Sequence, residues 1–338
     1  MRRGSSTATQ DPGEYGLKKK ILLTRRWTQD AESYLSGHYD VTLNASDVPL
    51  DTTALSQAMR DYDAICPTVT DAMIAAVLGT PGARVKLIGN FGVGYNHIDV
   101  EAARKAGITV TNTPDVLTDT TADLAILLML MATRRAGEGE RELRAGRWTG
   151  WRPTHMMGQS VSGKTLGVVG FGRIAQATAH RAHHGFGMQV AYYGRRRAPA
   201  DIEAACKARY VADLDTLVAE SDVLTLHCPG GAETHHLVNR ARLALMKPTA
   251  VLVNTARGTV VDEAALAEAL VTKRIAAAGL DVYEREPVVN PALLGLENVV
   301  LLPHLGSGTQ ETRTAMGMRV ARNVDLFFAG QPVQDKVV

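Results

Sequence analysis

Short apolar runs alternate with helical patterns along the first third of the chain. The strand-like segments between residues 18 and 114 read KKKILLT, YDVTLN, DAICPTV, VKLIGNFG and GITVTNTP. Helical stretches such as TALSQAM and VEAARKAG lie between them. Strands that alternate with helices are typical of a parallel sheet covered by helices. The pattern therefore predicts a first α/β unit that closes at Pro114.

A second alternating series follows a long helical stretch from Asp115 to about Arg135 and a segment rich in Gly, Trp and Pro. We interpret that segment, about 136–163, as an extended arm. The series then runs through KTLGVVGFG, MQVAYYG, DVLTLHCP, AVLVNTARG, IAAAGLDVYE and NVVLLPHLG. The last helical pattern, near Gln310 to Phe328, has no strand after it, so we expect it to fold back onto the first unit. The chain is predicted to form two doubly wound parallel-sheet α/β domains with an inter-domain cleft.

Composition narrows the possible partners. A chain of 338 residues favours about two domains. The net charge of +2, from 37 basic and 35 acidic residues, gives no overall field for nucleic acid or a membrane. The longest apolar run, LAILLMLMA, has nine residues, whereas a membrane span needs about 20. We therefore expect neither kind of partner.

The cysteines and histidines also carry expectations. Three cysteines without metal-ligand spacing favour a reducing compartment, and we predict a cytoplasmic protein without a bound metal. The histidine pairs 183–184 and 235–236 are interpreted as surface residues. Residues 1–17, rich in Gly, Ser, Thr and Pro without the apolar core of a secretory signal, are expected to be a disordered extension.

A glycine-rich turn opens the second series. Gly170, Gly172 and Ala175 form G-x-G-x-x-A between the strand LGVVG and the helix RIAQATAHRA. The first glycine permits a tight turn, the second lets a pyrophosphate approach, and the small third residue lets helix and strand pack. Backbone N–H groups near Arg173 and Ile174 would face the phosphates. The motif alone could be a mere turn, but between a strand and a helix it predicts dinucleotide binding.

A basic loop follows the next strand. About 20 residues past such a turn, an NAD-binding domain usually offers an acid to the ribose. Here the chain reads Gly194, Arg195, Arg196 and Arg197. Arginines offer forked donors to a 2′-phosphate, so the loop favours NADP(H), with NAD(H) possible; the alternative is a solvated basic loop. Arg195 is the first candidate for the phosphate and Arg196 the second, whereas Arg197 is expected to be solvated.

Four polar residues follow apolar strands of the second series. Arg257 follows AVLVNTA, Asp281 ends IAAAGLD, and His304 follows NVVLLP, while Glu286 comes five residues after Asp281. The carboxyl ends of parallel strands lie at one edge of a sheet, so we expect these side chains to converge. Reduction of a 2-oxo acid needs a cation for the carboxylate or carbonyl, a proton donor, and a carboxylate that favours the imidazolium. Taken one at a time, Arg257 could form a surface ion pair, His304 could be a capping residue, and Glu286 could be a charged loop residue.

The motifs around these residues resemble a known family. NTARGTVVDEAALAEAL, AAAGLDVYEREP, LLPHLGSGT and GFGRIAQA look like those of the D-isomer-specific 2-hydroxyacid dehydrogenases, and the resemblance extends from about Lys18. TPDVLTDTTADLAILLMLMATRR and GRWTGWRPTHMMG look like the glyoxylate and hydroxypyruvate reductases. The resemblance implies Rossmann and flavodoxin-like domains: residues 18–114 with 306–338 for the substrate, and 115–305 for the dinucleotide.

Family resemblance also implies roles for residues. Arg257, Glu286 and His304 would be catalytic, with His304 the proton donor in reduction, and Asp281 would receive the nicotinamide amide. NFGVGYNHIDV looks like the substrate loop. The residues expected to bind substrate are Val93, Gly94, Arg257, His304 and Trp151. The residues expected to line the cofactor are Thr121, Gly170, Gly172, Arg173, Ile174, Gly194, Arg195, Arg196, Cys228, Pro229, Thr255, Ala256, Arg257, Asp281, His304 and Gly306.

The resemblance also leads to expectations about the role of the arm and about the reaction that the protein catalyses. In the resembled subgroup, Trp151 or Trp148 would reach the active site of the neighbouring subunit of a homodimer; the alternative is a packing segment. We hypothesise NADPH-dependent reduction of glyoxylate, hydroxypyruvate or a related 2-oxo acid to the D-2-hydroxy acid. The rivals are another enzyme of the family, such as a phosphoglycerate dehydrogenase, and a dinucleotide-sensing corepressor that shares the fold.

Overall fold

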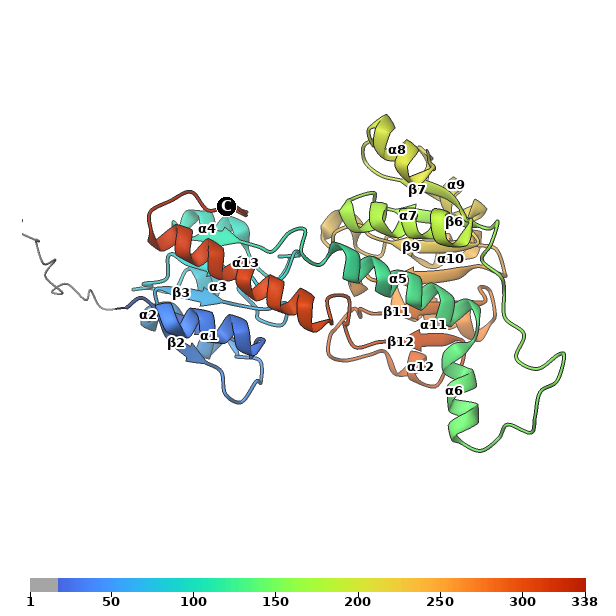
Figure 1. The fold of residues 1–338 in the computed structure, drawn as a ribbon, viewed down its shortest axis with the longest axis horizontal. Coiled ribbons are helices and arrows are strands. Elements are labelled where there is room, and N and C mark those ends of the chain that lie inside the picture. The colour runs from blue at the N-terminus through green and yellow to red at the C-terminus, as the bar shows by residue number, and fades with distance from the viewer. Residues whose placement is uncertain (1–17) are drawn as a thin grey trace, which may run out of the picture. The chain divides into compact units, whose positions relative to one another are not determined.

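The computed structural model describes residues 18–338, so the extension expected at residues 1–17 lies outside the described residues. The chain divides into two compact units (Figure 1). Unit 1 comprises residues 18–113 together with Gly317–Val338, and unit 2 comprises Pro114–Met316. Each unit is a parallel sheet with helices on its faces, which confirms the predicted pair of doubly wound α/β domains.

Unit 1 contains a five-stranded sheet in the order β2-β1-β3-β4-β5, and every pairing is parallel. This is the flavodoxin-like strand order. Its strands are β1 (Lys20–Leu23), β2 (Asp40–Leu43), β3 (Ala64–Cys66), β4 (Leu87–Gly89) and β5 (Thr109–Thr111). Its helices are α1 (Gln29–His38), α2 (Thr52–Asp61), α3 (Ala75–Leu78) and α4 (Val100–Lys105).

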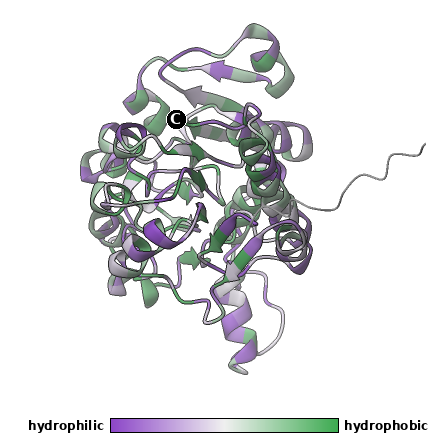
Figure 2. Cartoon of the chain, turned by 90° about the vertical axis from the view of Figure 1, so that its left-hand side faces the viewer, coloured by the Kyte–Doolittle hydropathy of each residue, from purple (hydrophilic) through white to green (hydrophobic). Residues whose placement is uncertain are grey.

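The last helix, α13 (Gln310–Phe328), contributes its later turns to unit 1. Val320, Ala321 and Val324 are buried in one apolar cluster with residues of β1, β3 and β4. A second cluster lies among α2, α3 and α4 with other residues of the same strands. Both faces of the sheet are therefore covered, which explains why the central strands are short continuous apolar runs. In Figure 2 the strands near the centre of the view are largely hydrophobic, and the helices and loops around them carry both hydrophobic and hydrophilic residues.

Unit 2 contains a seven-stranded parallel sheet in the order β12-β11-β10-β9-β6-β7-β8. The order reverses between β6 and β9, as in dinucleotide-binding domains. Its strands are β6 (Thr165–Val169), β7 (Gln189–Tyr193), β8 (Ala208–Tyr210), β9 (Val223–Leu226), β10 (Val251–Asn254), β11 (Ala277–Leu280) and β12 (Val299–Leu301). Its helices are α5 (Thr118–Thr133), α6 (Ala136–Arg144), α7 (Arg173–Phe186), α8 (Ala200–Cys206), α9 (Leu214–Glu220), α10 (Arg240–Leu245), α11 (Glu263–Val271) and α12 (Pro291–Leu294).

Every strand segment predicted from the sequence is a strand, and one strand was missed. β8 is a three-residue edge strand with the exposed Arg209 at its centre, so it has no apolar run. The helix expected from Asp115 to Arg135 is α5, which covers β10, β11 and β12. Among residues 18–338, no helix combines the length and the apolar character that a membrane span requires.

Candidate active site

The two glycines of the turn after β6 have different surroundings: at Gly170 the backbone conformation and close neighbours require a glycine, whereas Gly172 has free space around it. Gly170 has φ 83°, and a Cβ there would lie 2.8 Å from the backbone nitrogen of Cys228, at the end of β9. Gly170 therefore permits both the left-handed turn and the close packing of two strand ends. A Cβ at Gly172 would instead meet open space. Ala175, in the first turn of α7, is fully buried in the core of unit 2.

Two features of this region fit a bound dinucleotide. Gly172 is the N-cap residue of α7 and offers no side-chain cap, so the backbone N–H groups of the first turn are available to an anion, which binds favourably at a helix start. The hydroxyl oxygen of Thr255, just past β10, is buried and has no hydrogen-bond partner among residues 18–338. An unsatisfied buried hydroxyl costs about 1–3 kcal/mol, and a ligand polar group would remove this cost. Arg173 beside the turn is exposed and pairs with Asp115 at 3.0 Å.

The three arginines after β7 have different surroundings. Arg195 lies 3.2 Å from Glu233, and both side chains are 80% exposed. Arg196 is exposed and makes no hydrogen bond or ion pair within the described part of the chain. Arg197 donates twice to Glu203, at 2.9 and 2.8 Å, so it is held on α8 although its side chain remains 67% exposed. Arg197, then Tyr192, lower the pKa of Glu203 to about 2.

Asn254, which the sequence analysis did not single out, braces the loop that carries Arg257. Its side chain accepts a hydrogen bond from the Ala256 N–H at 3.0 Å and donates to the Arg257 carbonyl at 2.9 Å. The side chain of Arg257 packs on Gly230, where a Cβ would lie 2.9 Å from the arginine Cγ. Burial lowers the pKa of the Arg257 guanidinium, and the charge of Glu286 opposes that shift. The position of Asn254 at a strand end, just before a tight turn, could have predicted these hydrogen bonds to the backbone of the loop.

His304 and Glu286 form a direct pair. The imidazole Nδ1 lies 2.7 Å from the Glu286 Oε2, and Glu286 Oε1 accepts the Tyr283 N–H at 3.0 Å. Burial raises the pKa of Glu286, but the hydrogen bond and charge of His304 outweigh burial and hold this pKa below its ordinary value. The ionised carboxylate therefore accepts a hydrogen bond from Nδ1–H. The other ring nitrogen, Nε2, has no hydrogen-bond partner among the described residues and can carry a transferable proton.

Asp281 fixes the backbone beside His304. Its two carboxylate oxygens accept the N–H groups of Leu305 and Gly306, at 2.6 and 2.8 Å, and its carbonyl accepts the His304 N–H at 2.9 Å. Thr121 donates to the Gly306 carbonyl at 3.1 Å. His304 itself has φ 54°, a strained region for this residue type that these bonds hold in place. Burial raises the pKa of Asp281, against the Leu305 N–H and the charge of His304.

The predicted substrate loop lies in unit 1, after β4. The side-chain amide of the fully buried Asn90 donates to the carbonyls of Gly92 and Gly94, at 2.9 and 3.1 Å, and Asn112 donates to the Val93 carbonyl at 2.8 Å. The N–H groups of Val93 and Gly94 donate to no partner among residues 18–338. The loop is thus held by its carbonyls, and two adjacent N–H groups are left for an anion.

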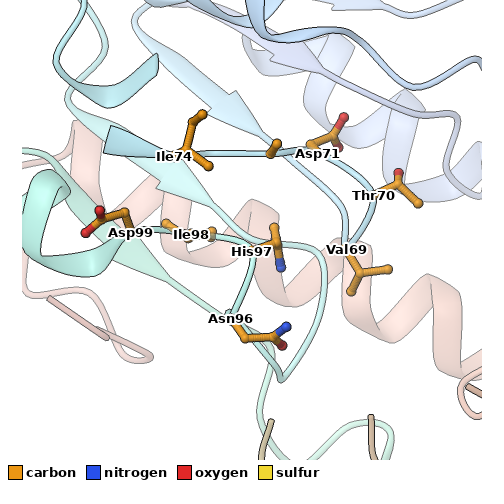
Figure 3. Close-up of a pocket in the computed structure, with 9 residues that line it drawn as sticks. Val69, Thr70, Asp71, Ile74, Asn96, His97, Ile98 and Asp99 are labelled. Carbon is orange, nitrogen blue, oxygen red and sulfur yellow. The ribbon is translucent and has the colours of Figure 1, made fainter. Parts of the chain in front are cut away.

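A pocket of about 310 Å³ adjoins this loop within unit 1. It lies between the segment that follows β3 and the segment that leads into α4, so it is past the carboxyl ends of β3 and β4 (Figure 3). Asp71 holds one wall: its Oδ2 accepts the hydroxyl of Thr24 at 2.7 Å and the N–H of Thr68 at 2.8 Å. The sequence analysis did not identify this pocket. Its lining residues are Val69, Thr70, Asp71, Ala72, Ile74, Asn96, His97, Ile98 and Asp99.

The structure thus groups the predicted site residues by unit. Thr121, Arg257, Asp281, Glu286 and His304 come together in unit 2. The glycine turn meets Cys228 at the point where the strand order reverses. Burial raises the pKa of the Cys228 thiol to about 11, so this thiol is neutral at ordinary pH. Val93 and Gly94 lie in unit 1, and Trp148 and Trp151 lie on the arm, 53% and 81% exposed.

Unit 2 has the strand order, glycine turn and open helix start of a dinucleotide-binding domain. Residues 126–306 match the sequence model of the D-isomer specific 2-hydroxyacid dehydrogenase, NAD binding domain. A glyoxylate reductase from Thermococcus litoralis is 44% identical over 319 residues, which cover 93% of this chain and 95% of that protein.

Solved structures agree with this match over the whole chain. A glyoxylate reductase from Paecilomyes thermophila, 34% identical, superposes with a TM-score of 0.83 over 95% of this chain and 98% of its own. An NADPH-dependent glyoxylate/hydroxypyruvate reductase from Sinorhizobium meliloti, in complex with NADP and malonate, is 35% identical and has a TM-score of 0.84, over 95% and 97%. The chain belongs to the D-isomer-specific 2-hydroxyacid dehydrogenase family. It is an oxidoreductase that uses a nicotinamide dinucleotide.

Proposed function

We propose that this enzyme reduces glyoxylate, hydroxypyruvate or a related small 2-oxo acid to the D-2-hydroxy acid, with NADPH preferred over NADH. The observation that carries the proposal is the 2.7 Å contact between His304 Nδ1 and Glu286, because it orients the imidazole and leaves Nε2 available to carry a proton to the substrate. The names of the relatives from Thermococcus litoralis and Sinorhizobium meliloti support the same substrate class.

The residues divide the chemistry between them. When bound, the dinucleotide supplies the hydride that reduces the carbonyl carbon. His304 gives its Nε2 proton to the oxygen of the new hydroxyl group while Glu286 holds the Nδ1 proton. Arg257 provides a fixed positive charge for the carboxylate or carbonyl of the substrate. The N–H groups of Val93 and Gly94 would bind a substrate carboxylate, which would make unit 1 the substrate-binding domain and unit 2 the dinucleotide-binding domain.

The preference for NADPH rests on the loop after β7. No acid stands at the end of β7, and Arg195 and Arg196 are exposed there. Forked donors stabilise a 2′-phosphate, whereas an acid would repel it. Arg197 is committed to Glu203, so we assign the phosphate to Arg195 and Arg196. The Sinorhizobium meliloti relative, whose solved structure holds NADP, supports this preference.

Steady-state assays with a panel of 2-oxo acids test the proposal. Glyoxylate, hydroxypyruvate, pyruvate and 3-phosphohydroxypyruvate would each be mixed with the enzyme and either NADPH or NADH, and the fall in cofactor absorbance measured. We expect the highest kcat/KM for glyoxylate or hydroxypyruvate with NADPH, and D-glycerate as the product from hydroxypyruvate. A preference for the phosphorylated substrate would instead favour a phosphoglycerate dehydrogenase. Cofactor binding without turnover of any acid would refute the enzymatic proposal and favour a dinucleotide sensor.

A further inference from the structure

Two histidines and a glutamate form a cluster apart from the proposed active site. His235 and His236 follow the short 3-10 turn Ala232–Thr234, and Glu284 follows β11. His236 Nε2 lies 2.7 Å from Glu284 Oε1. The rings of His235 and His236 stack with centroids 3.9 Å apart. One ligand atom from each of the three residues lies within 4.8 Å of the other two.

We propose that His235, His236 and Glu284 bind a divalent transition-metal ion of the zinc type. Two imidazoles and one carboxylate are a donor set that Zn²⁺ prefers, and three protein ligands leave a fourth position for water. In a tetrahedral site with bonds of about 2.0–2.1 Å, ligand atoms lie about 3.3 Å apart. The separations in the cluster run from 2.7 Å to at most 4.8 Å, so small side-chain rotations close the site.

Two of the three ligands are held by their backbones. The His236 N–H donates to the Thr259 carbonyl at 2.8 Å, and the Glu284 N–H donates to the Glu263 carboxylate at 2.6 Å. Both ligand side chains are partly buried, 33% and 24% exposed. His235 is exposed, so its ring can turn out of the stack to meet the ion at little cost.

The three residues of the cluster come from two loops that also carry residues of the proposed active site or residues near it. The histidines continue the loop that carries Pro229 and Glu233, and Glu284 lies two residues before Glu286. A bound ion would join these loops at a point that the catalytic scheme does not use. The sequence did not predict this site, because Glu284 lies 48 positions after His236 and the three residues show no recognisable metal-ligand spacing.

Co²⁺ as a spectroscopic probe tests the proposal on the full chain after treatment with a chelator. We expect one equivalent of Co²⁺ to give the intense visible bands of a tetrahedral site, and Zn²⁺ to abolish them by displacement. Zn²⁺ should also raise the Tm, because it binds the folded chain. His235→Ala and Glu284→Gln should each weaken Zn²⁺ at least tenfold, since even partners of metal ligands contribute 10–100-fold. His235 is exposed, so its variant should fold normally.

A second histidine pair provides the matched control. His180 and His184 lie one turn apart on α7, are both exposed, and have ring centroids 4.4 Å apart. They could bind a metal with two ligands. The double variant His180→Ala, His184→Ala should leave the Co²⁺ spectrum unchanged. Loss of binding in this double variant, equal binding in His235→Ala, or the absence of tetrahedral bands in the wild type would overturn the proposal.

Discussion

Two carboxylates beside His304 have opposite electrostatic environments. Glu286 faces the imidazole side chain, which keeps the pKa of this carboxyl below its ordinary value despite burial. Burial dominates at Asp281 and raises its pKa. Groups whose environments push their pKa values apart commonly have different roles at one site. Glu286 is suited to hold a charge next to the proton donor, and Asp281 is suited to fix the backbone of the residues that follow it.

Glu286→Gln tests the electrostatic role of this pair. Glu286 accepts the Nδ1 hydrogen bond as a carboxylate, and its lowered pKa keeps it ionised until the pH falls below the ordinary carboxyl range. In the wild type, kcat should therefore fall as the pH drops through the lowered pKa of Glu286. Replacing Glu286 with a neutral amide should lower kcat by about tenfold or more and remove this acid limb. The measurement is kcat against pH at saturating cofactor and substrate.

Glu284→Gln is the matched control for that experiment. Glu284 lies on the same loop, but its side chain contacts His236 and not His304. The same chemical change at this position should leave the pH profile in place when metal is excluded by a chelator. An unchanged acid limb in Glu286→Gln would remove Glu286 from its assigned role, whatever happens to the rate.

At the scale of elements, the loop between β7 and α8 separates three arginines that look equivalent in sequence. Arg195 has only a highly exposed pair with Glu233, and Arg196 makes no ion pair within residues 18–338, whereas Arg197 is fixed to Glu203 by two hydrogen bonds. Replacing Arg195 and Arg196 together with alanine should lower kcat/KM for NADPH by about 10–100-fold, because a charge-assisted hydrogen bond contributes about 1.5–3 kcal/mol. The value for NADH should change little. Kinetics with both cofactors measure the ratio.

Arg197→Ala is the control within the same loop. It removes the same charge but breaks the pair with Glu203, so it should reduce stability without changing the ratio of the two cofactors. Equal loss for NADPH and NADH in the double variant would indicate a general phosphate effect, and it would contradict the assignment of the 2′-phosphate to these residues.

The elements of the fold were largely predictable because each central strand is an apolar run between turn residues. Burial on both faces of a parallel sheet requires such runs, and the edge strand β8, which is not covered in this way, was missed. The carboxyl ends of the strands also indicated where Arg257 and His304 would lie. The braces at Asn254 and Asp281 were not predicted, because they depend on contacts between loops whose separation in sequence reveals nothing about distance.

At the scale of the whole molecule, the two units have different strand orders, and each has candidate ligand-binding groups of its own. Unit 2 has the dinucleotide-binding order with its reversal between β6 and β9, and unit 1 has the flavodoxin-like order. In each unit, the candidate ligand-binding groups follow the carboxyl ends of parallel strands, as open α/β sheets generally place them. The relatives match both units, because they cover 93–95% of this chain.

The arm is the part of the described chain whose apolar side chains are most conspicuously unburied. Leu143, Trp148, Trp151 and Met157 are 60%, 53%, 81% and 66% exposed, and α6 buries none of its residues. Such a concentration of exposed apolar side chains marks an interaction surface. We propose that a second copy of the chain covers it, which is the role that the sequence analysis expected for this arm.

The double variant Leu143→Glu, Trp151→Glu tests this proposed homodimer. Burial of each apolar side chain contributes about 1.5–3 kcal/mol, so two buried charges should shift the dimer to monomers at micromolar concentration. Light scattering coupled to gel filtration measures the mass. Leu294→Glu, at a 63% exposed position on α12, is the control and should leave the dimer intact. A monomeric wild type, or a double variant that remains dimeric, would show that the arm is a packing segment rather than a dimer contact.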